Sequence, residues 1–174
     1  MVSPGRKVLV IGYGNPGRLD DGLGPALAEM LARRSLPGVT VDADYQLTVE
    51  DAAAVAEHDV VVFADAAVSG TAPFWVRRVM PAARWSFSTH SVEPESVLGM
   101  AREMFGATTC GYALGIRGYA FDEFGEALTP QAKANLEAAV AYLALALQNG
   151  NLREVGHGPM ECGPVRAPAL HGDA

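Results

Sequence analysis

The segment KVLVIGYGNPGRLDDGLG, residues 7–24, limits the possible folds more than any other part of the sequence. Residues 7–12 form a short apolar run that ends in glycine, which predicts a strand buried on both faces of a sheet. Gly12, Gly14 and Gly17 then match the spacing G-x-G-x-x-G. In dinucleotide-binding proteins this spacing places helix amides against a pyrophosphate, so a nucleotide site is the first hypothesis to test.

Two acids and a proline in the same loop argue against a nucleotide. Asp20 and Asp21 stand where the phosphate charge would lie and would repel it, and Pro16 removes an amide donor. One acid is enough to cap the following helix. The second lies at the carboxyl end of a buried strand, where open α/β sheets bind ligands. A nucleotide-binding domain, with Asp42 or Asp44 holding a ribose, is the weaker alternative.

Strand patterns and helix patterns alternate along the rest of the chain. This alternation predicts an α/β protein with three α/β/α layers around a central, mixed but mostly parallel sheet of about five strands. Thr48 with Asp51 resembles a capping box, and Thr129 with Pro130 is typical of a helix start. The expected strands cover 7–12, 39–45, 59–66, 74–79 at an edge and 111–118, and the expected helices cover about 21–34, 48–58, 97–105 and 130–147.

The composition indicates one globular domain, which we assign to residues 1–149, followed by a flexible Gly- and Pro-rich tail at 150–174. A net charge of -7 gives no basic surface for nucleic acid or for an anionic membrane. The chain has two cysteines, and none of its apolar runs approaches about 20 residues. We therefore expect a cytoplasmic protein without a disulfide framework or a membrane anchor.

Two more potential ligands lie where other strands meet helices. Asp65 ends the strongest apolar run, and His90 lies between a β-like run and the helix that follows Pro94. Together with Asp21 they can converge on one rim of the sheet. Two carboxylates and one imidazole suit a borderline divalent ion such as nickel or zinc, with coordination positions left open.

These motifs resemble the hydrogenase maturation proteases, which trim the C-terminal extension of the large subunit of nickel-iron hydrogenases. The resemblance rests on GYGNPGRLDDGLG in the first segment, VVVFADA at 60–66, STHSVEPE at 88–95, GIRG at 115–118 and LTP at 128–130. It spans about residues 7–148. The family resemblance implies a phosphorylase/hydrolase-like α/β fold and glycines that shape a turn beneath an acidic ligand.

The resemblance also implies which residues act. The family's metal ligands fall on Asp21, Asp65 and His90, and many members have glutamate at the first of these positions. Asp21 and Asp65 are also the candidate catalytic groups, in a reaction that is either metal-assisted or of the aspartic type, and Asp20 is expected to orient the ligands without touching the metal. The supporting motif residues are Gly12, Gly14, Asn15, Asp20, Gly22 and Thr89.

The implied activity is endoproteolysis of a nickel-loaded large-subunit precursor by a cytoplasmic monomer or homodimer. The metal is supplied by the substrate, and another divalent ion could take its place. A nickel-dependent chaperone of the same precursor is the alternative. Other protease classes lack support, because the sequence has no H-E-x-x-H or G-x-S-x-G motif and Cys110 is interpreted as a small residue beside a strand. His157, Cys162 and His171 are interpreted as solvated residues of the tail.

Overall fold

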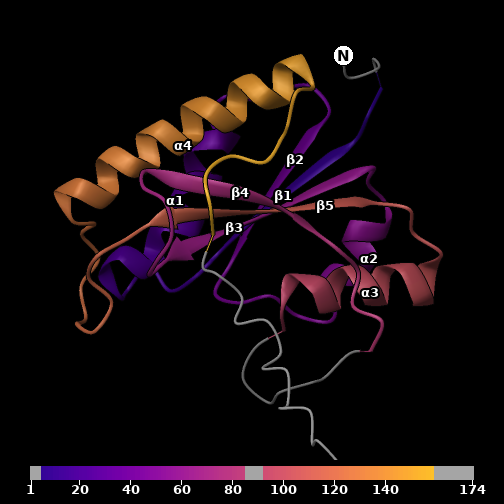
Figure 1. Cartoon of the computed structure of the whole chain (residues 1–174), viewed down its shortest axis with the longest axis horizontal. Coiled ribbons are helices and arrows are strands. Elements are labelled where there is room, and N and C mark those ends of the chain that lie inside the picture. Colours follow the sequence, from indigo (N-terminus) through magenta and orange to yellow (C-terminus); the bar gives the residue numbers. More distant parts are fainter. Residues whose placement is uncertain (1–4, 85–91, 159–174) are drawn as a thin grey trace, which may run out of the picture.

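A computed structural model describes residues 5–84 and 92–158. Its centre is a five-stranded sheet in the order β2-β1-β3-β5-β4 (Figure 1). Four neighbouring strands, β2, β1, β3 and β5, run parallel, and β4 lies antiparallel to β5 at one edge. The mixed, mostly parallel sheet expected from the sequence is confirmed. The strands are β1 (Val8–Tyr13), β2 (Val39–Asp44), β3 (Val60–Ala67), β4 (Phe74–Val79) and β5 (Cys110–Arg117).

Helices cover both faces of the sheet and complete the three layers (Figure 1). Strand side chains alternate between the faces, so each apolar strand contributes to two cores. One core joins Val10 and Val62 to α1 (Leu23–Ala32) and α4 (Pro130–Asn149). The other joins Ile11 and Phe63 to α2 (Asp51–Ala56) and α3 (Pro94–Phe105).

The helix ends follow the capping signals in the sequence. Thr129 caps α4 by accepting a hydrogen bond of 3.3 Å from the amide of Ala132. The amide of Thr48 donates to Asp51 at 2.7 Å, which is one half of the expected capping box. The helix expected from Asp21 begins later, at Leu23, because a 3₁₀ turn, η1 (Leu19–Gly22), precedes it.

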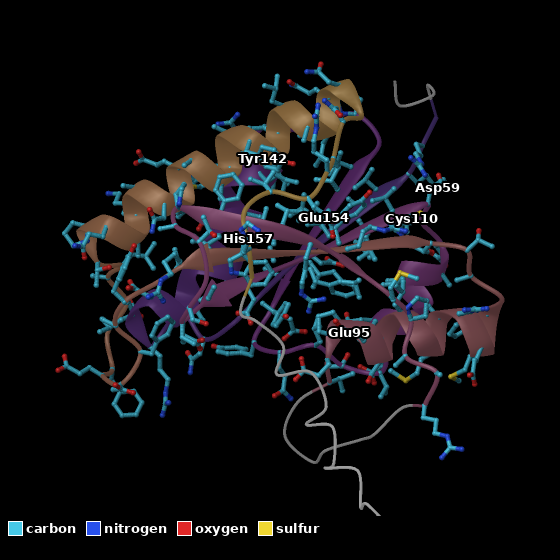
Figure 2. The ribbon with its side chains drawn as sticks, in the orientation of Figure 1. Asp59, Glu95, Cys110, Tyr142, Glu154 and His157 are labelled. Atoms are coloured by element: carbon cyan, nitrogen blue, oxygen red, sulfur yellow. The ribbon has the colours of Figure 1, made fainter. Side chains whose placement is uncertain are left out.

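The chain after α4 extends the folded part beyond Asn149. Val155 exchanges two backbone hydrogen bonds with Val76 of β4, at 2.8 and 3.0 Å, and the amide of Arg78 donates to Glu154 Oε1 at 2.9 Å. Figure 2 shows Glu154 and His157 on this segment beside β4. Residues 150–158 therefore differ from the expected tail. They cover an edge strand whose amides and carbonyls would otherwise lack partners.

Within the described part of the chain, no helix is both long and apolar enough to cross a membrane. Cys162 and His171 lie outside the described residues.

Candidate functional site

The glycines of the first loop allow the turn before α1 to pack directly against β1. A Cβ atom at Gly12 would lie 2.1 Å from the carbonyl oxygen of Gly24, and one at Gly14 would lie 2.1 Å from that of Asp21. Gly14 also has a φ of +142°, which favours glycine. The backbone of the turn and of α1 thus occupies the space beside these two positions, so the packing of the turn explains both glycines without a nucleotide.

Asp21 is held at the end of this loop by a hydrogen bond within the loop itself. The amide of Asn15 donates to Asp21 Oδ2 at 2.9 Å, while Asn15 Oδ1 accepts from the amide of Gly17 at 2.9 Å. A Cβ at Gly22 would lie 2.9 Å from Pro16 Cα, so the turn is tight on its other side as well. Asp21 is half-buried, and η1 lies against β3. The loop therefore presents one carboxylate beside the strand that contains Asp65.

Asp65 lies near the carboxyl end of β3, as the sequence predicted. It follows Phe63 by two residues and so lies on the sheet face that packs against α3. The pKa of Asp65 is raised to about 7, mainly by burial and to a smaller extent by the charges of Asp21 and Glu93, while the hydrogen bond from the Ala66 amide lowers it. The turn η1 that carries Asp21 contacts β3, so the charge of Asp21 acts on the Asp65 carboxyl.

Asp65 lines a pocket of about 160 Å³, which lies between the sheet and the start of α3. Its walls combine the aromatic rings of Tyr13, Phe63 and Trp75 with the charged groups of Arg77 and Glu93, and Ala66, Pro94, Ala113, Leu114 and Gly115 complete the lining. Burial raises the pKa of Tyr13 above its ordinary value, and the nearby Asp65 adds to this. The Tyr13 hydroxyl therefore stays neutral and can donate a hydrogen bond.

Arg77, one of the residues that line this pocket, forms an ion pair with α3. Arg77 Nη1 lies 2.7 Å from Glu95 Oε1, and Figure 2 shows Glu95 at the start of α3. Trp75, Arg77 and Glu93 are pocket residues that the sequence did not predict. Trp75 and Arg77 lie two residues apart and so share one face of β4, and the pairing of β4 with β5 brings that face beside Asp65.

Asp20 has a different environment from its neighbour Asp21. Its side chain is completely buried and accepts hydrogen bonds from the amides of Tyr119, Ala120 and Thr129 and from the Thr129 hydroxyl, all between 2.8 and 3.1 Å. Burial alone would raise the pKa of Asp20, but these hydrogen bonds outweigh it and leave the pKa below its ordinary value. Asp20 is thus a buried, charged anchor between two loops.

The third expected metal ligand, His90, and its neighbour Thr89 lie outside the described residues. Within residues 5–84 and 92–158, no three His, Cys, Asp or Glu side chains gather closely enough to hold a metal ion. The structure thus brings Asp21 and Asp65 together, while the complete set of three ligands stays a prediction.

Comparisons with known structures agree with this architecture. The hydrogenase maturation protease HycI from Thermococcus kodakarensis is 23% identical with a TM-score of 0.67, covering 84% of this chain and 96% of that one. A hydrogenase 2 maturation peptidase from a Thaumarchaeota archaeon is 22% identical with a TM-score of 0.61, covering 84% and 100%. The hydrogenase maturating endopeptidase HybD from E. coli is 22% identical with a TM-score of 0.59, covering 86% and 97%.

The sequence matches no protein-family model and no curated protein sequence. By its parallel sheet and the acids at the strand ends, the chain is an α/β protein with its candidate ligand site at the carboxyl rim of the sheet. Within that class, its fold is the one found in the hydrogenase maturation proteases.

Proposed function

We propose that this protein is a cytoplasmic endopeptidase that removes the C-terminal extension from the nickel-loaded large-subunit precursor of a nickel-iron hydrogenase. The observation that supports it most is the interacting pair Asp21 and Asp65, at the carboxyl rim of a fold shared with maturation proteases. The two acids of the glycine loop, Asp20 and Asp21, argue against the competing nucleotide function.

The paired carboxylates fit recognition of a metal ion that arrives on another protein. Two carboxylate oxygens with the His90 imidazole make a small set of ligands, which binds a free ion weakly but can complete the coordination of an ion already fixed in the precursor. Recognition through these ligands allows cleavage only after nickel has been inserted. The nickel ion is therefore part of the substrate.

The same groups can support peptide hydrolysis. A water molecule attacks the carbonyl carbon of the scissile bond, and nickel can favour this attack by polarising the carbonyl. Asp21 or Asp65 accepts the proton of the water, which then passes to the leaving amine as the C–N bond breaks. The neutral Tyr13 hydroxyl is a donor available in the adjoining pocket.

The test is intact mass spectrometry of the precursor after incubation with the protein. The wild type should shorten the nickel-loaded precursor and leave the nickel-free precursor unchanged. Asp21→Asn, Asp65→Asn and His90→Gln should each slow this cleavage at least about a hundredfold. Asp42→Asn is the matched control, because Asp42 is an exposed acid on β2 and should have no effect.

The outcomes separate the competing functions. A stable complex with an unshortened precursor would replace the protease with a nickel-dependent chaperone. Full cleavage by all three variants would remove the assigned site. Saturable NAD binding, measured by calorimetry and abolished by Asp44→Asn, would instead favour the nucleotide-binding alternative.

A further inference from the structure

The loop that presents Asp21 is attached to a distant segment, residues 118–129, through both backbone and side chain. The amide of Leu19 donates to the Gly125 carbonyl at 2.7 Å, and the amide of Gly125 donates to the Gly17 carbonyl at 2.9 Å. The amide of Asp20 donates to the Ala120 carbonyl at 3.0 Å. Three backbone hydrogen bonds thus connect parts of the chain that lie about a hundred residues apart.

Close packing reinforces this connection. A Cβ at Gly118 would lie 2.9 Å from Asp20 Cβ, and one at Gly125 would lie 2.7 Å from Leu19 Cδ2. Leu19 itself has a φ of +50°, which is uncommon for a residue with a branched side chain. The surrounding contacts must therefore hold this turn in a conformation that an isolated chain would avoid.

The Asp20 carboxylate is the centre of the connection. Its Oδ2 atom accepts hydrogen bonds from the amides of Tyr119 and Ala120 and from the Thr129 hydroxyl, and its Oδ1 accepts from the Thr129 amide. Both oxygens of the buried carboxylate therefore have hydrogen-bond donors, three at Oδ2 and one at Oδ1. Such networks fix one local geometry and are costly to leave half-satisfied.

We propose that Asp20 is a positioning residue, which fixes Asp21 at the rim of the sheet by anchoring the first loop to residues 118–129. The inference builds on the proposed function, in which Asp21 meets the nickel-loaded precursor. The adjacent acids then have separate tasks. Asp20 holds the loop from within, and Asp21 faces the substrate.

The direct test uses hydrogen exchange followed by NMR, without any substrate. The Asn15 amide reports the placement of Asp21, because it donates to Asp21 Oδ2, and the Leu19 amide reports the contact with Gly125. In Asp20→Asn one oxygen can still face the three donors at the Oδ2 position, but an amide group then faces the Thr129 amide. Exchange at Asn15 and Leu19 should accelerate at least about tenfold.

Thr109→Val is the matched control. It disturbs another buried polar side chain, a hydroxyl whose single proton is shared between the carbonyls of Val55 and His58, but at the other end of the sheet. It should leave exchange at Asn15 and Leu19 unchanged. Equal acceleration in this control, or unchanged exchange at Asn15 in Asp20→Asn, would overturn the proposal.

Two variants of Thr129 complete the design. Thr129→Val removes the hydroxyl donor while Asp20 keeps its three amide donors, so hydrogen exchange at Asn15 and Leu19 should accelerate less than in Asp20→Asn. This variant replaces Asp20→Asn in the test if Asp20→Asn fails to fold. Thr129→Ser keeps the hydroxyl and should exchange as the wild type does. A Thr129→Ser variant as fast as Thr129→Val would count against an anchor that depends on this hydrogen bond.

Precursor cleavage supplies the functional readout. Asp20→Asn should lower kcat/KM for the nickel-loaded precursor at least about tenfold, and Thr129→Ser should stay within about twofold of the wild type. Accelerated exchange with unchanged cleavage would show a purely structural role for Asp20 and overturn the proposal. If the wild type itself does not cleave, the proposed function fails, while the exchange result still decides whether Asp20 positions Asp21.

Discussion

Replacing Asp65 by asparagine should stabilise the protein at neutral and alkaline pH, although it removes a proposed ligand. Burial is the main reason why the pKa of this carboxyl rises from 3.8 to about 7. A rise of this size means that the wild type loses at most about 4 kcal/mol of unfolding free energy when the carboxyl of the folded protein ionises. Because Asp65 keeps part of its surface in water, we expect a gain of about 2–4 kcal/mol. Asparagine keeps an oxygen that can accept the Ala66 amide.

The stability gained in Asp65→Asn should increase as pH rises. The folded pKa of Asp65 is higher than its ordinary value, so its contribution to stability is fully present at low pH and is lost as pH rises toward about 7. Across this window the wild type should lose up to about 1.4 kcal/mol per pH unit from this group. The asparagine side chain of the variant does not titrate, so the two proteins should be equally stable near pH 4 and differ most above about pH 7.

Urea unfolding followed by circular dichroism, in buffer with a metal chelator, measures the difference. Glu93→Gln is an informative control, because burial raises the pKa of Asp65 more than the charge of Glu93 does. That variant should keep most of the pH dependence of the wild type. The reasoning is refuted if Asp65→Asn is no more stable than the wild type at about pH 8, or if the difference between them is the same at about pH 4.5.

Three further predictions test the loop, the core and the segment beside β4. Gly14→Ala should lower the unfolding free energy by more than about 2 kcal/mol, since its φ is +142° and the new Cβ would meet the Asp21 carbonyl; urea unfolding with a stability close to that of the wild type would contradict the tight turn. Leu143→Ala should cost about 2–5 kcal/mol in the same assay, because Leu143 is fully buried between α4 and the sheet, and a loss below about 1 kcal/mol would mean that this core is loosely packed. Val155→Pro removes the amide that donates to Val76 and should cost about 1 kcal/mol, with faster hydrogen exchange at the Val76 amide; unchanged exchange there would show that residues 150–158 do not hold the edge of β4.

The sequence predicts those parts of the fold that local patterns determine. The apolar runs that became β1 and β3 end within one residue of their expected limits, because a strand buried on both faces is apolar throughout. Thr129 and Pro130 mark the start of α4 correctly, because a cap and the first helical position involve only neighbouring residues. The placement of Asp65 at the end of β3 follows from the same reasoning.

The rest depends on contacts between distant residues. Nothing local indicates that β4 joins the sheet beside β5, so the pocket formed by Trp75 and Arg77 could not be predicted. The partners of Asp20 lie about a hundred residues further along the chain. Residues 150–158 have no hydrophobic period, and their pairing with β4 becomes apparent only when that strand is known to be an edge.

The two adjacent aspartates show how one short turn can serve both structure and chemistry. In a 3₁₀ turn consecutive side chains point about 120° apart, so Asp20 and Asp21 cannot face the same surroundings. Asp20 meets four donors and keeps its charge because they outweigh its burial, whereas Asp21 interacts with a second carboxylate whose pKa it helps to raise. The G-x-G spacing is therefore explained by the close packing of this turn against β1, which places one acid in the interior and the other at the rim of the sheet.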